Sequence, residues 1–172
     1  MGGQHTTIMT DQVLSDENVD FAARGEGEET FVEFLQEYQG KKNWSNVDGL
    51  CYKKGGSVAK NKNRELIDNI DNIPYPSKEV LYDIENYSET ALSKIFASRG
   101  CPYQCTYCGT QNIWTNKVRF HSPERIISEI EDTKRKHGCT YFTFFDDVFG
   151  LNKKKTFNLL DKMIESNLNI NW

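Results

Sequence analysis

The sequence predicts an α/β protein in which the end of one domain is joined, through a hairpin linker, to the first β/α units of a second domain. Three patterns predict this arrangement. A strand-like run and an amphipathic helix flank a glycine turn within residues 1–40, two strand-like runs flank Gly55-Gly56, and strands alternate with helices from residue 91 onward. We therefore expect three regions, at residues 1–40, 41–90 and 91–172.

The first region is predicted to form a strand over residues 19–23 and a helix that starts after the run Gly25-Glu26-Gly27. Glu28 and Glu29 follow in the first turn, where the helix dipole favours acidic side chains. Gly40 predicts the end of this helix. Its apolar face carries Phe31, Phe34, Leu35 and Tyr38.

The second region is predicted to contain a β-hairpin and an extended linker. Residues 49–53 and 57–60 have the composition of strands, and Gly55-Gly56 supplies the turn between them. In the run Asp71-Asn72-Ile73-Pro74-Tyr75-Pro76, each proline disfavours helix at the residue before it. We expect an extended segment there.

The third region is predicted to follow the order β–loop–α–β–α–β, with its first strand over residues 92–97. Ser122-Pro123 has the N-cap serine and first-turn proline of a helix that ends at Gly138. The apolar run at residues 141–145 is too short for a helix and predicts a strand buried on both faces of a parallel sheet. Asn152 predicts the cap of the next helix, whose apolar residues in register are Phe157, Leu160 and Ile164.

The bulk properties of the sequence argue against several kinds of partner. The net charge of −4 gives no overall attraction to nucleic acid, so we expect no nucleic-acid partner. No apolar run approaches the roughly 18 residues of a membrane span. The opening residues, Met1-Gly2-Gly3-Gln4-His5, lack the basic and apolar segments of a secretory leader. We expect a cytoplasmic protein without a membrane partner.

The cysteines indicate a metal site. Three of the five fall within eight residues, in the run Cys101-Pro102-Tyr103-Gln104-Cys105-Thr106-Tyr107-Cys108, and the other two are Cys51 and Cys139. An odd, clustered set is a poor disulfide framework and a good ligand set. A 4Fe–4S cube normally takes four thiolates. Three would leave one iron open to the amino and carboxylate groups of S-adenosylmethionine.

A structural zinc site is the alternative interpretation of the same cysteines. Zinc takes four ligands, usually as Cys-x-x-Cys pairs, and only Cys105 and Cys108 form such a pair. The zinc alternative would make the chain a zinc-stabilised interaction module without enzymatic activity. The spacing favours the iron–sulfur cube.

The run from Ser98 to Cys108 resembles the signature of radical S-adenosylmethionine (radical SAM) enzymes. The resemblance implies a partial TIM-like barrel in which the cysteine run follows the first strand, and assigns Cys101, Cys105 and Cys108 to the 4Fe–4S cluster. It also implies that Tyr107 contacts the adenine of S-adenosylmethionine. At the end of the second strand, Asp146-Asp147 departs from the Gly-Gly-Glu form of many members and resembles the Asp-Asp form of the cobalamin-dependent branch. There the resemblance places a contact with the cofactor's amino group, and a helix-capping turn is the other interpretation.

The N-terminal region is similar to the last third of the Rossmann-like cobalamin-binding domain in that branch. The similarity lies in Gly2-Gly3-Gln4-His5 and in the run from Val19 to Thr30. It implies that Gly2, Gly3, Gly25 and Gly27 line the groove for the nucleotide tail of cobalamin. Two ordinary turns are the alternative. The Asp-x-His-x-x-Gly cobalamin loop of the family would precede Gly2.

The resemblance implies a radical SAM enzyme that cleaves S-adenosylmethionine reductively and carries out cobalamin-dependent methyl transfer or ring rearrangement. A methylthiotransferase-like enzyme without functional cobalamin is the alternative. We expect a small-molecule or metabolite substrate and an electron donor such as flavodoxin or ferredoxin. Since the family's barrel has about six β/α units, we expect the chain to be an internal portion of a longer enzyme, inactive alone.

Overall fold

The computed structural model describes residues 1–172, which form two compact units. The first unit comprises residues 1–68 and 102–117, and the second comprises residues 69–101 and 118–172. The chain therefore leaves the second unit after Cys101 and returns to it at Val118. No helix in either unit combines the length and the apolar character needed to cross a membrane.

The first unit is built on a three-stranded antiparallel sheet in the order β1-β2-β3. The predicted hairpin is confirmed as β2 and β3, joined at Gly55-Gly56, where both glycines have positive φ. Sequence analysis missed the two short helices before β1. The elements of this unit are α1 (Gln4–Ile8), α2 (Thr10–Ser15), β1 (Phe21–Ala23), α3 (Gly27–Gln39), η1 (Trp44–Asn46), β2 (Leu50–Lys54), β3 (Ser57–Lys60) and α5 (Gln111–Trp114).

The predicted first helix is confirmed as α3, which ends at Gly40. Its aromatic side chains form a cluster: Phe34 lies 4.8 Å from Phe21 and 5.5 Å from Trp44, measured between ring centroids. On the same helix, Phe31 and Tyr38 remain more than half exposed. The apolar stripe of α3 is therefore only partly buried, at Phe34.

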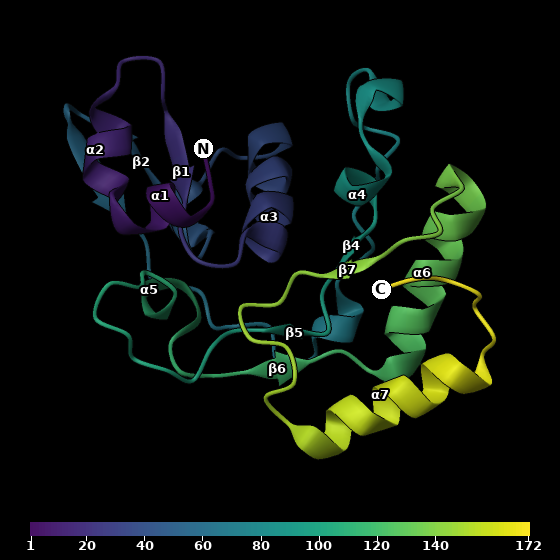
Figure 1. The fold of residues 1–172 in the computed structure, drawn as a ribbon. Helices are drawn as coiled ribbons and strands as arrows, with labels where there is room; N and C mark the ends of the chain where they lie inside the picture. Colours follow the sequence, from purple (N-terminus) through teal and green to yellow (C-terminus); the bar gives the residue numbers. More distant parts are fainter. The chain divides into compact units, whose positions relative to one another are not determined.

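The second unit contains a short parallel sheet and flanking helices. Strand β4 pairs with β7 in parallel register, and Tyr141 forms a parallel bridge to Asn171. Helices α6 and α7 pack against each other beside this sheet (Figure 1). The elements of this unit are η2 (Ile70–Asn72), η3 (Ile84–Asn86), α4 (Glu89–Leu92), β4 (Lys94–Ile95), β5 (Ser98–Arg99), β6 (Arg119–Phe120), α6 (Pro123–His137), β7 (Thr143–Phe144) and α7 (Lys153–Glu165).

Both helix caps predicted for this unit are confirmed. Ser122 accepts a hydrogen bond from the Arg125 N–H at the start of α6, and Gly138 ends that helix in the left-handed conformation. Asn152 accepts a hydrogen bond from the Lys155 N–H at the start of α7. Local sequence signals were sufficient here because capping depends on neighbouring residues.

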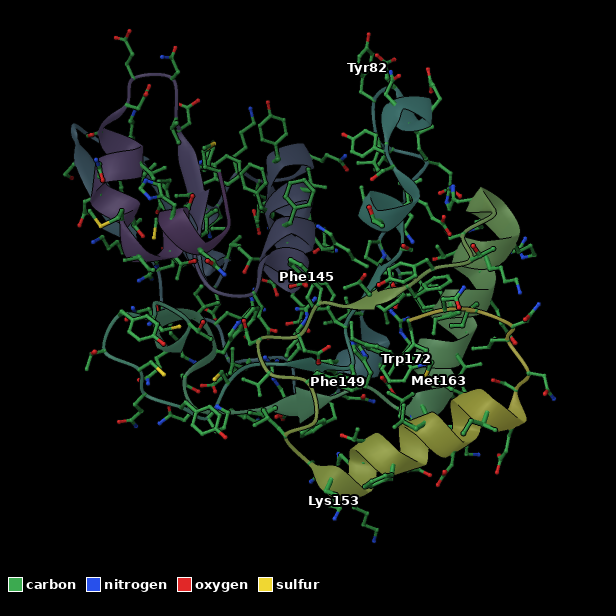
Figure 2. All side chains as sticks on the ribbon, viewed as in Figure 1. Tyr82, Phe145, Phe149, Lys153, Met163 and Trp172 are labelled. Carbon is green, nitrogen blue, oxygen red and sulfur yellow. The ribbon has the colours of Figure 1, made fainter.

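The core of the second unit consists of apolar side chains from the sheet and from α6 and α7. Phe142, Ile95 and Ile130 are its most deeply buried members. Near the end of the chain, Phe149 and Trp172 lie close together (Figure 2), with ring centroids 6.1 Å apart. This aromatic contact joins the segment after β7 to the last residues.

Four expectations for local structure were wrong. Residues 141–145 are not buried on both faces, because Tyr141 and Phe145 are about half exposed while Phe142 is buried. The buried face of α7 is formed by Leu159 and Met163, whereas Phe157 and Ile164 point to solvent. The strand predicted over residues 92–97 is limited to β4, because α4 occupies the preceding turn. The linker begins with the short helix η2 before it becomes extended.

Candidate active site

Two short strands, which form a stem, flank the cysteine run in the sequence. The stem consists of β5 and β6, which pair antiparallel with Ser98 opposite Phe120 and Arg99 opposite Arg119. The N–H of His121 donates to the Ala97 carbonyl at 2.9 Å and extends the pairing by one step. Ser98 and Arg119 are each only 5% exposed. The stem is therefore a packed part of the second unit.

The cysteine loop, residues 101–108, is irregular and open to solvent. Cys101 is half-buried, Cys105 and Cys108 are exposed, and none is in a disulfide. One turn orders the loop, in which the Cys108 N–H donates to the Cys105 carbonyl at 3.0 Å. The Cys108 thiol also lies 3.1 Å from the Thr110 hydroxyl.

The structure does not assemble these cysteines into a finished ligand set. No group of three or more His, Cys, Asp or Glu side chains is positioned to hold a metal ion. The donor set nevertheless fits an iron–sulfur cluster in its chemistry, because three reduced thiols lie in a short segment and two of them face solvent. Tyr107, expected to contact adenine, is 90% exposed and its ring is free of protein packing.

The two aspartates after β7 have different surroundings. The carboxylate of Asp146 accepts hydrogen bonds from the Ala97 N–H at 3.0 Å and from the Ser98 hydroxyl at 2.5 Å. Asp147 is exposed and makes no hydrogen bond or ion pair within the chain. Partial removal from water, together with the negative charge of Asp146, raises the pKa of the Asp147 carboxyl. The Asp147 carboxylate is thus open to a ligand, whereas the Asp146 carboxylate already accepts two hydrogen bonds from the protein.

The structure brings the two predicted glycine turns together through one threonine. The hydroxyl of Thr7 donates to the Gly3 carbonyl and accepts a hydrogen bond from the Gly25 N–H, both at 3.0 Å. Met1 makes backbone hydrogen bonds to both Phe21 and Ala23, which is the pattern of a parallel strand pair. The Gly2-Gly3 turn and the Gly25-Gly27 turn are therefore adjacent in the first unit.

The four glycines of these turns fall into two groups, those with a positive φ and those without. Gly3 and Gly25 have φ values of 93° and 72°, a region that favours glycine. Gly2 and Gly27 have no positive φ, and a Cβ built at either would meet nothing within 4 Å. Protein packing therefore explains neither of the latter two. Space beside them is what a closely approaching ligand needs.

The segment after the cysteine loop packs on the same part of the first unit. Helix α5 lies against α1, the helix that follows Gly2-Gly3. At Gly109 the approach is close, because a Cβ there would stand 3.1 Å from the Cδ1 of Ile8. The chain on the C-terminal side of the cysteines is thus anchored next to the glycine turns.

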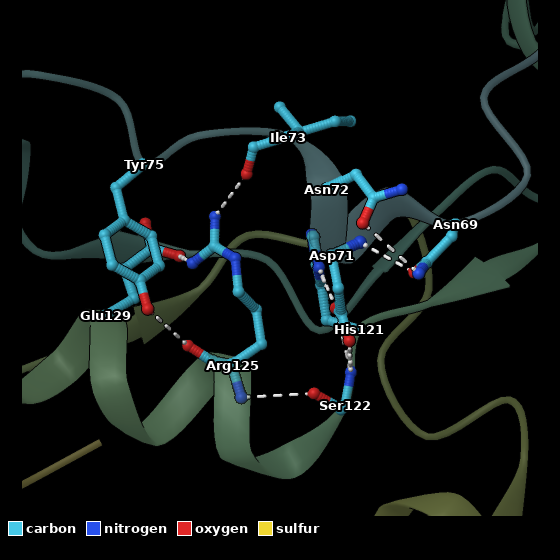
Figure 3. Close-up of polar contacts among 9 residues, drawn as sticks. All are labelled: Asn69, Asp71, Asn72, Ile73, Tyr75, His121, Ser122, Arg125 and Glu129. Atoms are coloured by element: carbon cyan, nitrogen blue, oxygen red, sulfur yellow. Dashed lines mark hydrogen bonds and ion pairs between the residues drawn. The ribbon is translucent and has the colours of Figure 1, made fainter.

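Sequence analysis missed a polar network that holds the outgoing strand of the stem (Figure 3). Asp71 accepts hydrogen bonds from the Ser122 N–H and pairs with His121 Nδ1 at 2.9 Å. Arg125 donates to the Ile73 carbonyl at 3.0 Å and stacks on the ring of Tyr75, 3.6 Å from its centroid. About 50 residues of sequence separate the partners, so no local pattern indicates the network.

The acids on both sides of the stem line one cavity of about 300 Å³. Asp71 and Asp146 contribute a carboxylate each, and His121 and Lys155 add basic groups. Burial would raise the pKa of Asp71, but hydrogen bonds from Ser122 and His121 outweigh it and hold that pKa below its usual value. Burial lowers the pKa of His121, so its neutral form is favoured.

Comparison with known proteins identifies the class of protein that this fold and loop define. Residues 95–171 match the family model of the radical SAM superfamily. The match starts in β4, includes the cysteine loop and ends one residue before the last of the chain. Residues 95–171 therefore belong to the radical SAM superfamily.

The similarity also extends beyond the matched segment. An uncharacterized methyltransferase of Pyrococcus horikoshii is 33% identical over all of this chain and 38% of its own length. The anaerobic magnesium-protoporphyrin IX monomethyl ester cyclase of Cereibacter sphaeroides is 29% identical over 98% of the chain and 28% of its own length. The chain thus spans roughly a third of the length of these relatives.

A solved structure supports the fold. The radical S-adenosylmethionine methyltransferase TsrM of Kitasatospora setae, solved with cobalamin and a 4Fe–4S cluster, superposes with a TM-score of 0.77. Its identity is 15%, and the match covers 96% of this chain and 33% of that one. The predicted fold class and the resemblance to cobalamin-dependent radical SAM enzymes are confirmed.

Proposed function

We propose that this chain is the part of a cobalamin-dependent radical SAM enzyme that binds the iron–sulfur cluster and part of each cofactor. Cys101, Cys105 and Cys108 hold the cluster. The observation that carries the proposal is the cysteine loop itself, with three cysteines outside any disulfide within eight residues, in a segment that matches the superfamily model. A 4Fe–4S cluster with one open iron supplies the electron that cleaves S-adenosylmethionine reductively.

The residues around the loop would bind S-adenosylmethionine. The exposed ring of Tyr107 offers a flat apolar surface for adenine. Asp147 offers a carboxylate without a protein partner for the amino group, beside Asp146.

The paired glycine turns support cobalamin as the second cofactor. Thr7 holds the turns at Gly3 and Gly25 together, and open space remains beside Gly2 and Gly27. Several relatives are named methyltransferases, among them a cytidylyl-2-hydroxyethylphosphonate methyltransferase, and others are named ester cyclases. We infer methyl transfer or ring rearrangement on a small-molecule substrate, with flavodoxin or ferredoxin as electron donor in the cytoplasm.

The open face of the β4–β7 sheet supports a substrate site in the second unit. Parallel sheets normally have both faces covered, yet Phe96 and Phe145 are about half exposed on this face. Their rings meet edge to face at 6.1 Å, and the Lys94 ammonium lies 4.5 Å from the centroid of Phe145. A substrate would cover apolar rings and one positive charge here.

Metal analysis tests the proposed cluster. The chain, purified and reconstituted under anaerobic conditions, should contain about four iron and four sulfide per chain. It should be brown, with charge-transfer absorbance near ~400 nm. Stoichiometric zinc without that absorbance would contradict the cluster and favour the zinc-stabilised module.

Cobalamin binding separates the cobalamin-dependent enzyme from the methylthiotransferase-like alternative. We expect the full-length enzyme to retain hydroxocobalamin through dialysis. A Gly27→Phe substitution should weaken retention, because it fills the open space beside the turn without opposing the backbone conformation. Lys54→Phe, at an exposed position at the end of β2, introduces the same side chain and is the control. Equal retention by both variants would contradict the proposed groove.

A further inference from the structure

Asp146 is already engaged by the protein at the base of the cysteine stem. Its Oδ2 accepts from the Ala97 N–H and its Oδ1 accepts from the Ser98 hydroxyl. Ser98 is 5% exposed, so its hydroxyl has little access to water as an alternative partner. Hydrogen bonds to a charged acceptor are roughly twice as strong as neutral ones. Asp146 therefore fixes the chain at the point where β5 begins.

This point lies close to the first cysteine. Ser98 begins β5, and only Arg99 and Gly100 separate it from Cys101. Gly100 has a φ of 104°, so the backbone turns sharply there and the direction of Cys101 depends on where β5 is held. The Ala97 carbonyl simultaneously accepts from the His121 N–H on the outgoing side. Asp146 thus binds Ala97, the residue whose carbonyl connects the incoming side of the stem to His121 on the outgoing side.

Asp147 has the opposite character. Its side chain is exposed, and neither a donor nor a cation of the chain contacts its carboxylate. An ammonium ligand is recognised by a carboxylate with open acceptor sites. All the acceptor sites of Asp147 are open, whereas each oxygen of Asp146 already accepts one hydrogen bond, from a backbone N–H or from a hydroxyl.

We propose that Asp146 is a positioning residue that fixes the stem and Cys101, and that Asp147 alone of the pair contacts the amino group of S-adenosylmethionine. This inference rests on the proposed function. It divides between two residues a role that the Asp-Asp resemblance assigns to both. The structural basis is the difference in partners between the two carboxylates.

The conservative variant of Asp146 distinguishes positioning from charge recognition. In Asp146→Asn, the amide oxygen can accept from the Ala97 N–H and the amide nitrogen can donate to the Ser98 hydroxyl. These two hydrogen bonds, which we call the brace, therefore persist without the charge. Asp146→Ala removes the brace. The readout is a titration of S-adenosylmethionine into the reduced cluster of the full-length enzyme, followed by electron paramagnetic resonance. Asp161→Asn, exposed on α7, is the control.

We expect Asp146→Asn to bind S-adenosylmethionine within about threefold of the unchanged enzyme, and Asp147→Asn to bind about tenfold more weakly, as loss of one charge-assisted hydrogen bond predicts. Asp146→Ala should lose about tenfold or fail to retain the cluster, and Ser98→Ala should change binding in the same direction by less. If Asp146→Asn were as defective as Asp146→Ala, Asp146 would bind by charge and the inference would be wrong.

A second readout does not need any cofactor. Hydrogen exchange of the chain without metal should show lower protection at the stem amides, including that of Ala97, in Asp146→Ala, and normal protection in Asp146→Asn. Unchanged protection in Asp146→Ala would overturn the inference whatever the metal result. Absence of a cluster in the unchanged protein would instead overturn the proposed function. The two failures are therefore distinguishable.

Discussion

The cysteine loop and the stem beside it in sequence differ in almost every physical property. In the loop, Tyr103 and Tyr107 are 57% and 90% exposed, and one backbone hydrogen bond orders the turn at Cys105. In the stem, Ser98 and Arg119 are buried and carboxylates engage the strand on each side. The residues that we propose to bind the cluster thus lie on an exposed segment, and the residues that we propose to position them lie on a buried one.

This difference predicts that substitutions in the two regions fail in different ways. A change in the loop should remove a ligand and leave the free energy of unfolding nearly unchanged. A change in the stem should lower the free energy of unfolding, because it leaves buried polar groups without partners. Measuring cluster content and stability on the same variants separates these outcomes.

The largest effect is expected in the loop. Cys105→Ala should abolish stable cluster binding, because a second iron would lack its protein ligand. The exposed position predicts a change in the free energy of unfolding within about 0.5 kcal/mol. Iron and sulfide analysis after anaerobic reconstitution measures the first, and denaturant unfolding of the metal-free chain measures the second.

Cys139→Ala is the matched control for this experiment. Cys139 is 1% exposed and belongs to the core of the second unit. We expect it to keep full iron and sulfide content and to lose some stability. Loss of the cluster in Cys139→Ala to the same extent as in Cys105→Ala would replace the three-cysteine site with a four-thiolate site.

The next effect is expected in the stem. Asp71→Ala leaves the His121 ring and the Ser122 N–H without their acceptor, which should lower the free energy of unfolding by ~1–3 kcal/mol. Denaturant unfolding measures it, with Asp161→Ala on the exposed face of α7 as the control. An unchanged midpoint would show that the brace at Asp71 does not stabilise the stem.

Tyr107→Ala is a second loop substitution that should affect binding and not stability. The ring is 90% exposed, so its removal should not change stability. If it stacks on adenine in the complex, its loss should weaken S-adenosylmethionine binding by about 1 kcal/mol. Equilibrium dialysis of the reconstituted full-length enzyme measures this. Unchanged affinity would remove Tyr107 from the binding site.

The smallest effect is expected in the pH dependence of the stem. Burial lowers the pKa of His121 below its ordinary value of 6.5; hydrogen bonding to Asp71 opposes this shift, and nearby Arg125 and Glu129 act in opposite directions. The unfolded chain therefore takes up a proton first as pH falls. His121 contributes fully to stability above pH 6.5 and loses that contribution as pH falls through its folded pKa.

Unfolding midpoints at pH 7 and pH 5 measure this dependence. The unchanged chain should be less stable at pH 5. His121→Gln should reduce the difference between the two pH values, whereas His5→Gln, at an exposed position, should not. An equal pH dependence in both variants would show that another group is responsible.

Sequence analysis reached the elements whose causes are local. The caps at Ser122 and Asn152, the Gly138 end of α6 and the Gly55-Gly56 hairpin all depend on residues within a few positions of each other, and all were confirmed. The cysteine run could also be interpreted as a cluster-binding candidate from the sequence, because the spacing of cysteines indicates which kind of metal site they suit.

The braces could not be predicted because their partners are distant in sequence. Asp71 meets Ser122 across 51 positions and Asp146 meets Ser98 across 48. The wrong face of α7 has a similar cause: Phe157 and Ile164 fit a helical period as well as Leu159 and Met163 do, and tertiary packing selects the latter pair. The exposed face of residues 141–145 was missed for a related reason. A continuous apolar run does not show whether both faces of the strand are covered.

Formation of 5′-deoxyadenosine tests the central claim most directly. The full-length enzyme, reconstituted anaerobically and reduced with dithionite, should convert S-adenosylmethionine to 5′-deoxyadenosine. Cys101→Ala, Cys105→Ala and Cys108→Ala should each abolish the product, and Cys51→Ala should leave it within a few-fold. An enzyme that retains iron and sulfide but releases no 5′-deoxyadenosine, or a Cys105→Ala variant that still releases it, would contradict the account.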